Sequence, residues 1–244
     1  MRPAVSVLLF CGLSIPSWPQ TPIRLSMPVD EYSLQANSFI GALLKISVRF
    51  LVPIGVEWVK SADTLKPVQF TRTHTTAADV IRVVVSTHAG YAWRMEDGVV
   101  HVFQRDLVKD RRNPLNITID FDEEPETVTL ANNDLFQMVS HVARTPELPG
   151  IAYNRFGSAV EPVFSFAARS VPARSILSKI VTAGLSAAMP SMKRVWVATF
   201  PENPVYSRTG FLEVVPMLDP KFVSSQPFWI LLSYGEPPPE KMEK

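Results

Sequence analysis

The sequence predicts an α+β fold, in which short strands and two amphipathic helices alternate around a small mixed sheet. Apolar residues recur at helical spacing in two segments, 39–50 and 77–85, and short segments rich in Val, Ile and aromatic residues flank both. The pair Asp97–Gly98 separates two further segments of alternating polarity, which is typical of a β-hairpin. Residues 31–104 are therefore expected to follow the order β-α-β-β-α-β-β.

The composition of the 244-residue chain is that of a folded protein. Hydrophobic residues make up 46% and charged residues 19%, so the chain is long and apolar enough for one large or two small domains. Lys and Arg number 24 against 23 Asp and Glu, and this balance predicts neither nucleic acid nor an acidic membrane surface as a partner. With 22 Pro and 10 Gly, no Gly-rich phosphate-binding loop is expected.

Residues 1–20 are predicted to be a signal peptide. The apolar run 4–15 follows a single positive residue and is too short to cross a bilayer as a helix, which takes about 20 residues. A buried N-terminal strand or an uncleaved anchor is the alternative. Cys11 does not predict a lipoprotein, because Phe10 precedes it where a small residue is expected. We expect a periplasmic or secreted bacterial protein whose mature chain has no cysteine and no membrane span.

The first predicted domain opens with a strand in which Tyr32 and Leu34 alternate with polar residues. Ser38 is a suitable N-cap for the helix that follows, and Pro53 ends that helix. The apolar face of the helix consists of Phe39, Ala42, Leu43, Ile46 and Phe50, and strands are expected next at 54–59 and 67–71.

A second helix is predicted to begin after Thr76. Thr76 and Asp79 have the spacing of a capping box, with Asp in place of the usual Glu or Gln. The β-branched residues at 83–85 lower the helix propensity by about a few tenths of a kcal/mol each, but the cap and the periodicity agree. Gly90 ends the helix, whose apolar stripe consists of Ala77, Val80, Ile81, Val84 and Val85.

The hairpin at 90–103 is expected to turn at Asp97–Gly98 in a two-residue type I′ turn, since both positions of that turn need a positive φ. His101 is then interpreted as a solvated cross-strand neighbour of Arg94 and not as a ligand. The expected pairs are Met95–Val100, Trp93–Val102 and Arg94–His101, with Trp93, Met95, Val100 and Val102 facing the core and Arg94, Glu96 and His101 facing solvent.

The layout of residues 31–104 resembles the short N-terminal domain shared by secretins and TonB-dependent receptors. Those domains begin with a strand like YSLQANSF (32–39) that leads into a helix like ALLKIS (42–47), and they continue with a strand like VPIGVEW (52–58). They close with a second helix and a hairpin that ends like DGVVHVF (97–103). The family's domains dock to partners at the inner membrane and carry no catalytic residues, so the resemblance implies a protein partner in the cell envelope.

The rest of the chain is divided into a linker at 105–115, a second α+β module at 116–235 and a solvated tail at 236–244. The short basic run 109–112 in the linker is interrupted by an acid and is interpreted as solvated. The module is expected to begin with two strands joined by an acidic turn at 120–126, followed by a helix from about Asn133. The segment SSQPFWILLSYG (224–235) is predicted to be a docking helix with its apolar residues inward.

The second module also suggests a repeat of the first. Placing Phe164 over Tyr32 aligns a strand, a helix with apolar residues at 176, 177 and 180, and a further strand with the β-α-β start of the first domain. The alignment gives only three identities, a number that also arises by chance. The sequence therefore leaves open whether the second half repeats the first.

No catalytic, cofactor-binding or metal-binding residue is predicted. The acidic group at 120–126 lacks the Gly and Glu that an EF-hand loop needs at its sixth and twelfth positions, and it is interpreted as a solvated turn. Ser186 lies in GLSAA, which departs from the nucleophile-elbow pattern at its last position. None of the histidines has the i, i+4 spacing of a helical metal pair: His74, His88, His101 and His141.

Three functions follow as hypotheses. The first is an exported, non-enzymatic module that binds a protein partner in the cell envelope, for example by strand addition to an open sheet edge, although no partner-binding residue is assigned. The second is a cell-wall or glycan-binding protein, which would expose at least two of Trp58, Trp196 and Trp229 on one surface. The third and least favoured is a periplasmic hydrolase that uses an acid from 120–126 with a histidine.

Overall fold

The structure is a computed structural model that describes residues 24–111, 113–127, 134–135, 137–139, 141–142, 151–154, 163–182, 193–201 and 229–234. The predicted signal peptide, the predicted tail and Ser186 lie outside these residues. Among the helices of the described part, none is both long enough and apolar enough to cross a membrane.

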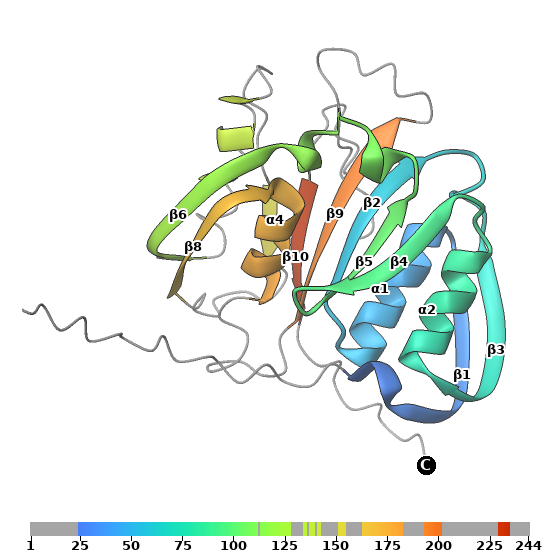
Figure 1. The fold of residues 1–244 in the computed structure, drawn as a ribbon. Coiled ribbons are helices and arrows are strands. Elements are labelled where there is room, and N and C mark those ends of the chain that lie inside the picture. The colour runs from blue at the N-terminus through green and yellow to red at the C-terminus, as the bar shows by residue number, and fades with distance from the viewer. Residues whose placement is uncertain are drawn as a thin grey trace, which may run out of the picture.

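The first half folds in the predicted order β-α-β-β-α-β-β, and the α+β class is confirmed (Figure 1). Helices α1 and α2 lie between a two-stranded ribbon, β1–β3, and the strands β4, β5 and β2 of a larger sheet. The bounds are β1 Pro28–Ala36, α1 Phe39–Phe50, β2 Ile54–Lys60, β3 Val68–Thr76, α2 Ala77–Ser86, β4 Tyr91–Glu96 and β5 Val99–Gln104, with a short 3-10 turn at Arg24–Ser26 before them.

Both helices begin at the predicted caps. The Ser38 hydroxyl accepts the Gly41 backbone N–H at 3.1 Å, and the Thr76 hydroxyl accepts that of Asp79 at 3.2 Å. Each bond satisfies one of the donors that the first turn of a helix leaves without a partner. Helix α1 ends one turn before Pro53, with Leu51 in the left-handed conformation at φ 52°.

The hairpin turns at Asp97 and Gly98, whose φ values of 49° and 79° confirm the predicted turn, and its three expected residue pairs are all present. Val100 and Val102 are fully buried in the core, as predicted. The prediction for Met95 is wrong, because its side chain is 39% exposed. Met95 belongs to the last pair but one before the turn, on a strand at the end of the sheet, where its side chain is not enclosed.

The second half contributes β6 Thr118–Thr127, β7 Ile151–Asn154, β8 Val163–Pro172, α4 Ala173–Thr182, β9 Lys193–Pro201 and β10 Trp229–Tyr234, with helical residues between 134 and 142. The predicted docking helix at 224–235 is wrong, since 229–234 form a strand that pairs with β9 on one side and β7 on the other. The predicted acidic turn at 120–126 is also wrong. The chain runs through it as one strand, β6, with irregular pairing to β8 at two points.

One six-stranded sheet runs through both halves in the order β4-β5-β2-β9-β10-β7. Strand β2 pairs in parallel with β5 on one side and with β9 on the other, so the two predicted modules share a sheet. The predicted linker 105–115 is only partly exposed. Lys109 and Arg111 of its basic run are exposed, whereas Leu107, Asn113 and Leu115 are buried, and two 3-10 turns, Leu107–Lys109 and Pro114–Asn116, shape it. Leu107 and Leu115 of this connection belong to the core of the second half.

The second half repeats the topology of the first. Strands β6 and β8 pair antiparallel, as β1 and β3 do, and β10 lies antiparallel to β9 and parallel to β7, as β5 does to β4 and β2. In each half, a non-glycine residue with positive φ stands three positions before the second helix. These residues are His74 before α2, at 48°, and Ser170 before α4, at 50°. The alignment of Phe164 with Tyr32 is therefore wrong, since β8 corresponds to β3 and not to β1.

The helices of the two halves also match residue by residue. Buried apolar residues of the first half recur 96 positions later in the second, on the face that each helix turns to its own core. The pairs are Phe39/Leu135, Leu43/Val139, Ala77/Ala173, Val80/Ile176, Ile81/Leu177, Val84/Ile180 and Val85/Val181.

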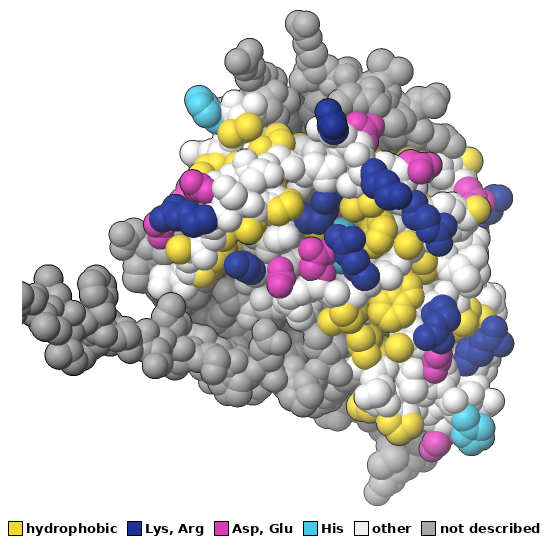
Figure 2. Space-filling view, in the orientation of Figure 1, with side chains coloured by type: hydrophobic (Ala, Val, Ile, Leu, Met, Phe, Trp, Pro, Cys, Tyr) yellow, Lys and Arg dark blue, Asp and Glu magenta, His cyan; other side chains and the backbone are white. Residues whose placement is uncertain are grey.

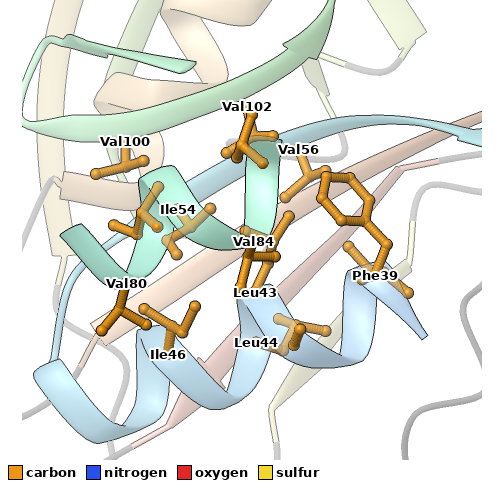
Figure 3. Close-up of a cluster of buried hydrophobic side chains, with 14 of the residues drawn as sticks. Phe39, Leu43, Leu44, Ile46, Ile54, Val56, Val80, Val84, Val100 and Val102 are labelled. Atoms are coloured by element: carbon orange, nitrogen blue, oxygen red, sulfur yellow. The ribbon is translucent and has the colours of Figure 1, made fainter. Parts of the chain in front are cut away.

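The two cores lie on opposite faces of the shared sheet. Figure 3 shows the first, where α1 and α2 pack on Ile54, Val56, Val100 and Val102. On β9, Val197 belongs to the first core, whereas its neighbours Trp196 and Ala198 belong to the second, with α4. Because successive side chains of a strand point to opposite faces, β9 closes both cores at once.

Candidate functional site

A cluster of buried polar side chains lies where the two halves meet. Glu57 on β2 is fully buried, and its carboxylate accepts three side-chain donors. These are His101 Nε2 from β5 at 3.0 Å, Arg174 Nε from α4 at 2.7 Å and Asn113 Nδ2 from the connection at 2.7 Å. We call Glu57, His101, Asn113, Asn116 and Arg174 the seam cluster.

The two asparagines fix the connection against this cluster. Asn113 accepts the Leu115 backbone N–H at 2.9 Å, and its amide also donates to the Leu107 carbonyl at 3.1 Å. Arg174 Nη1 donates to Asn116 Oδ1 at 2.5 Å. One buried carboxylate thus gathers a strand pair from the first half, a helix from the second and the segment that joins them.

The electrostatics of the seam cluster keep Glu57 ionised. Burial raises the pKa of its carboxyl, but the hydrogen bond from His101 and the charge of Arg174 outweigh burial, and the pKa lies below its ordinary value. Arg174 is 6% exposed, so the two partners form an ion pair away from water. Removing either partner of such a pair leaves the other charge buried without compensation, which destabilises the fold.

The prediction that His101 is solvated is wrong. Its side chain is 1% exposed, because α4 and the Trp196 ring, 5.5 Å away between ring centroids, cover the face of β5 that the hairpin alone would leave open. Its second ring nitrogen, Nδ1, lies 3.6 Å from Glu96, which also pairs with Arg94 at 2.7 Å. Contact with His101, opposed by partial burial and helped by Arg94, lowers the pKa of Glu96 to about 2.

Gly55 lets the Trp196 ring, which covers His101, lie close to strand β2. Gly55 is the Cα partner of both His101 on β5 and Trp196 on β9, so the three residues lie side by side across the sheet. A Cβ atom on Gly55 would overlap the Trp196 ring. The absence of a side chain at Gly55 therefore makes room for the indole against the seam.

The seam cluster contains acid and base groups, but these groups are almost inaccessible to a substrate. General acid–base or nucleophilic catalysis requires that a substrate atom come within hydrogen-bond distance of the reacting group. The side chains of Glu57 and His101 are 0% and 1% exposed, and protein donors already occupy both oxygens of Glu57. The arrangement supports a structural role, in which a buried ion pair joins the two halves.

A second candidate is a hollow of about 430 Å³ between β6, β8 and the helical residues near 141. Asp120, His141 and Ser170 all line it, and the Ser170 backbone N–H donates to the Asp120 carboxylate at 2.7 Å. Among the described residues, no hydrogen bond links His141 to either of the other two. The remaining lining residues are Thr118, Ile119, Met138 and Val142.

Other predicted features are separated from these sites. Trp58 and Trp196 are 3% and 0% exposed, so they cannot form the aromatic surface that a glycan-binding protein would need. The ring centroid of His88 lies 4.3 Å from that of Phe39. Within the described ranges, no three His, Cys, Asp or Glu residues are grouped closely enough to hold a metal ion.

Comparison with known proteins adds no assignment: no family model, no curated protein and no solved structure matches the chain. The resemblance to the short N-terminal domain of secretins and TonB-dependent receptors stays a prediction. From the sequence, Glu57 is assigned no role and His101 is interpreted as solvated, so the seam cluster is not predicted. Arg174, the ion-pair partner of Glu57, lies 117 positions from it, and no local pattern connects the two.

Proposed function

We propose that this chain is an exported, non-enzymatic module of the bacterial cell envelope that binds a protein partner along the edge strand β4. The observation that carries the proposal is the position of β4 at one end of the six-stranded sheet, with β5 as its one neighbour among the described strands. Figure 1 shows β4 on the outside of the sheet, to the right of β5. An edge strand offers backbone donors and acceptors to an added strand.

The hairpin geometry identifies which backbone groups of β4 face outward. Glu96 and Val99 flank the two-residue turn and therefore exchange hydrogen bonds, and bonded pairs alternate with non-bonded pairs along the hairpin. The bond from Arg105 N–H to the Gly90 carbonyl, at 2.9 Å, agrees with this alternation. The N–H and C=O groups of Trp93 and Met95 consequently point away from β5, toward the open edge.

The side chains beside this edge suit a partner with both polar and apolar groups. Met95 is 39% exposed, and Arg94 on the other face lies 5.0 Å over the Phe103 ring while it pairs with Glu96. In Figure 2, the part of the surface where Figure 1 places β4 carries apolar and basic side chains beside one another. Backbone pairing along β4 would supply affinity, and these side chains would supply selectivity.

The test is a pull-down from a bacterial envelope fraction with the purified chain as bait. Met95→Pro removes an outward N–H that β5 does not use, so we expect it to abolish recovery of a defined membrane protein. Met95→Ala is the matched control, because it shortens the same side chain and keeps the N–H, and it should recover the partner. Equal recovery with Met95→Pro would contradict the β4 edge, and recovery of peptidoglycan fragments alone would favour a glycan-binding function.

The hollow with Asp120, His141 and Ser170 favours a hydrolase as a second candidate. Its residue types are those of nucleophilic catalysis, but a nucleophile and its base normally lie within about 3.2 Å of each other. The Asp120 carboxylate is engaged by a backbone N–H, and all three side chains are exposed. Hydrolysis of simple ester substrates that is lost in His141→Ala would support this candidate over the first.

A further inference from the structure

We propose that copies of this chain join head to tail, with β7 of one copy pairing alongside β4 of the next and extending the six-stranded sheet. The partner is thus a second copy of the same chain. The inference rests on how the two halves are joined inside one chain and goes beyond the proposed function, which concerns a different protein.

The internal joint shows which edges of the repeated unit fit together. Each half contributes three strands to the sheet, β4-β5-β2 from the first and β9-β10-β7 from the second. The halves meet where β2 pairs in parallel with β9 over seven residue pairs, from Ile54–Val195 to Lys60–Pro201. By the shared topology, β9 corresponds to β4 and β2 corresponds to β7.

The same two kinds of edge are left over at the ends of the sheet. One end is β4, the counterpart of β9, and the other is β7, the counterpart of β2. Among the described strands, each of these has a single neighbour, β5 and β10. Repeating the internal joint therefore places β4 of one copy beside β7 of another.

Strand directions are compatible with this repetition. Strands β2, β5 and β9 run one way, and β4, β10 and β7 run the other way. A β4 strand placed beside β7 in the direction it has in the chain is parallel to it, as β9 is to β2. Each half is turned over relative to the one before, which agrees with the two cores on opposite faces. Because the joint uses a different edge of each copy, adding one copy leaves β4 unpaired at one end and β7 at the other. A head-to-tail joint of this kind generates open assemblies or rings.

The joint between two copies is expected to be weaker than the joint between the two halves of one chain. Strand β7 has four residues, Ile151–Asn154, against seven in β2. The ion pair of the seam cluster is not repeated either, because Arg174 corresponds to Ala78, the residue 96 positions earlier. We therefore expect assembly to be reversible and to depend on concentration.

The test is light scattering on the purified chain over a range of concentrations. The weight-average mass should rise from the 27.2 kDa of one chain through successive multiples of it. Met95→Pro and, as a second variant that leaves the backbone donor in place, Met95→Lys should both remain at the mass of one chain, since an edge Lys also opposes strand pairing. Met95→Ala should assemble like the unchanged chain.

Mixing distinguishes a head-to-tail joint from a symmetric dimer. Met95→Pro chains keep β7, so they should add to the β4 end of a growing assembly and lower its mean mass when mixed with unchanged chains. A constant mass of one chain at every concentration, growth that stops at two chains, or normal assembly of both Met95→Pro and Met95→Lys would overturn the proposal. A negative result here leaves the pull-down outcome standing, because that experiment scores a protein other than the bait.

Discussion

At the residue scale, Glu57 is the side chain on which the join between the halves depends most. Its carboxylate is fully buried and ionised, and its three donors come from β5, α4 and the connection. Removing one donor from a buried charge costs more than removing an exposed ion pair, because water cannot replace the lost partner. The stability of the whole chain is therefore expected to be sensitive to substitutions in the second half that touch this one residue of the first.

Arg174→Ala should lower the free energy of unfolding by about 3–5 kcal/mol, because it leaves the Glu57 charge buried without its cation. Urea denaturation followed by fluorescence measures the change. Arg169→Ala is the matched control, since Arg169 pairs with Asp122 where both side chains are 62% exposed, and it should cost less than about 1 kcal/mol. Similar losses in the two variants would show that the seam cluster is not a stabilising ion pair.

At the scale of elements, the sequence was most informative where the signal is local. The caps at Ser38 and Thr76 and the turn at Asp97–Gly98 are set by neighbouring residues, and all three were predicted correctly. The strand β10 was mistaken for a helix because a short apolar run has no periodicity that separates the two. Its pairing with β9 and β7, from distant parts of the chain, decides its conformation.

The burial of His101 shows the same limit for the candidate site. Within the hairpin, alternation places His101 opposite the first core, and that inference is correct. The second half then covers this face with α4 and Trp196, which a reading of the first half alone does not reveal. Residues that face away from one core can face another when a sheet is shared.

Gly55→Ala tests the close approach of β9 to β2. The new methyl group overlaps the Trp196 ring, so we expect a loss of about 1–3 kcal/mol in the free energy of unfolding, seen as a lower thermal midpoint. In the background of Trp196→Leu, which lacks the overlapping ring atoms, the same substitution should cost clearly less. Additive losses in the double variant would contradict the contact.

At the scale of the whole molecule, two units of the same topology are fused into one sheet through β2 and β9. The fusion explains why Leu107, Asn113 and Leu115 of the connection are buried and why β9 has apolar residues on both faces. It also leaves β4 at one end, on which both proposed interactions depend, and β7 at the other, on which the proposed assembly depends. The shared sheet is the central claim, since the site, the proposed function and the assembly all follow from it.

A disulfide between β2 and β9 tests that claim most directly. In a chain with Cys11 replaced by Ser, Val56→Cys and Val197→Cys place two thiols on Cα partners of adjacent strands, within the 4.4–6.8 Å that a disulfide spans. Mild oxidation and peptide mass mapping should recover the cross-linked pair from the folded monomer. Val102→Cys with Val197→Cys should give none, because β2 separates those strands by about 9.5 Å. Failure of the first pair to cross-link in folded protein, or equal cross-linking of both, would contradict the shared sheet.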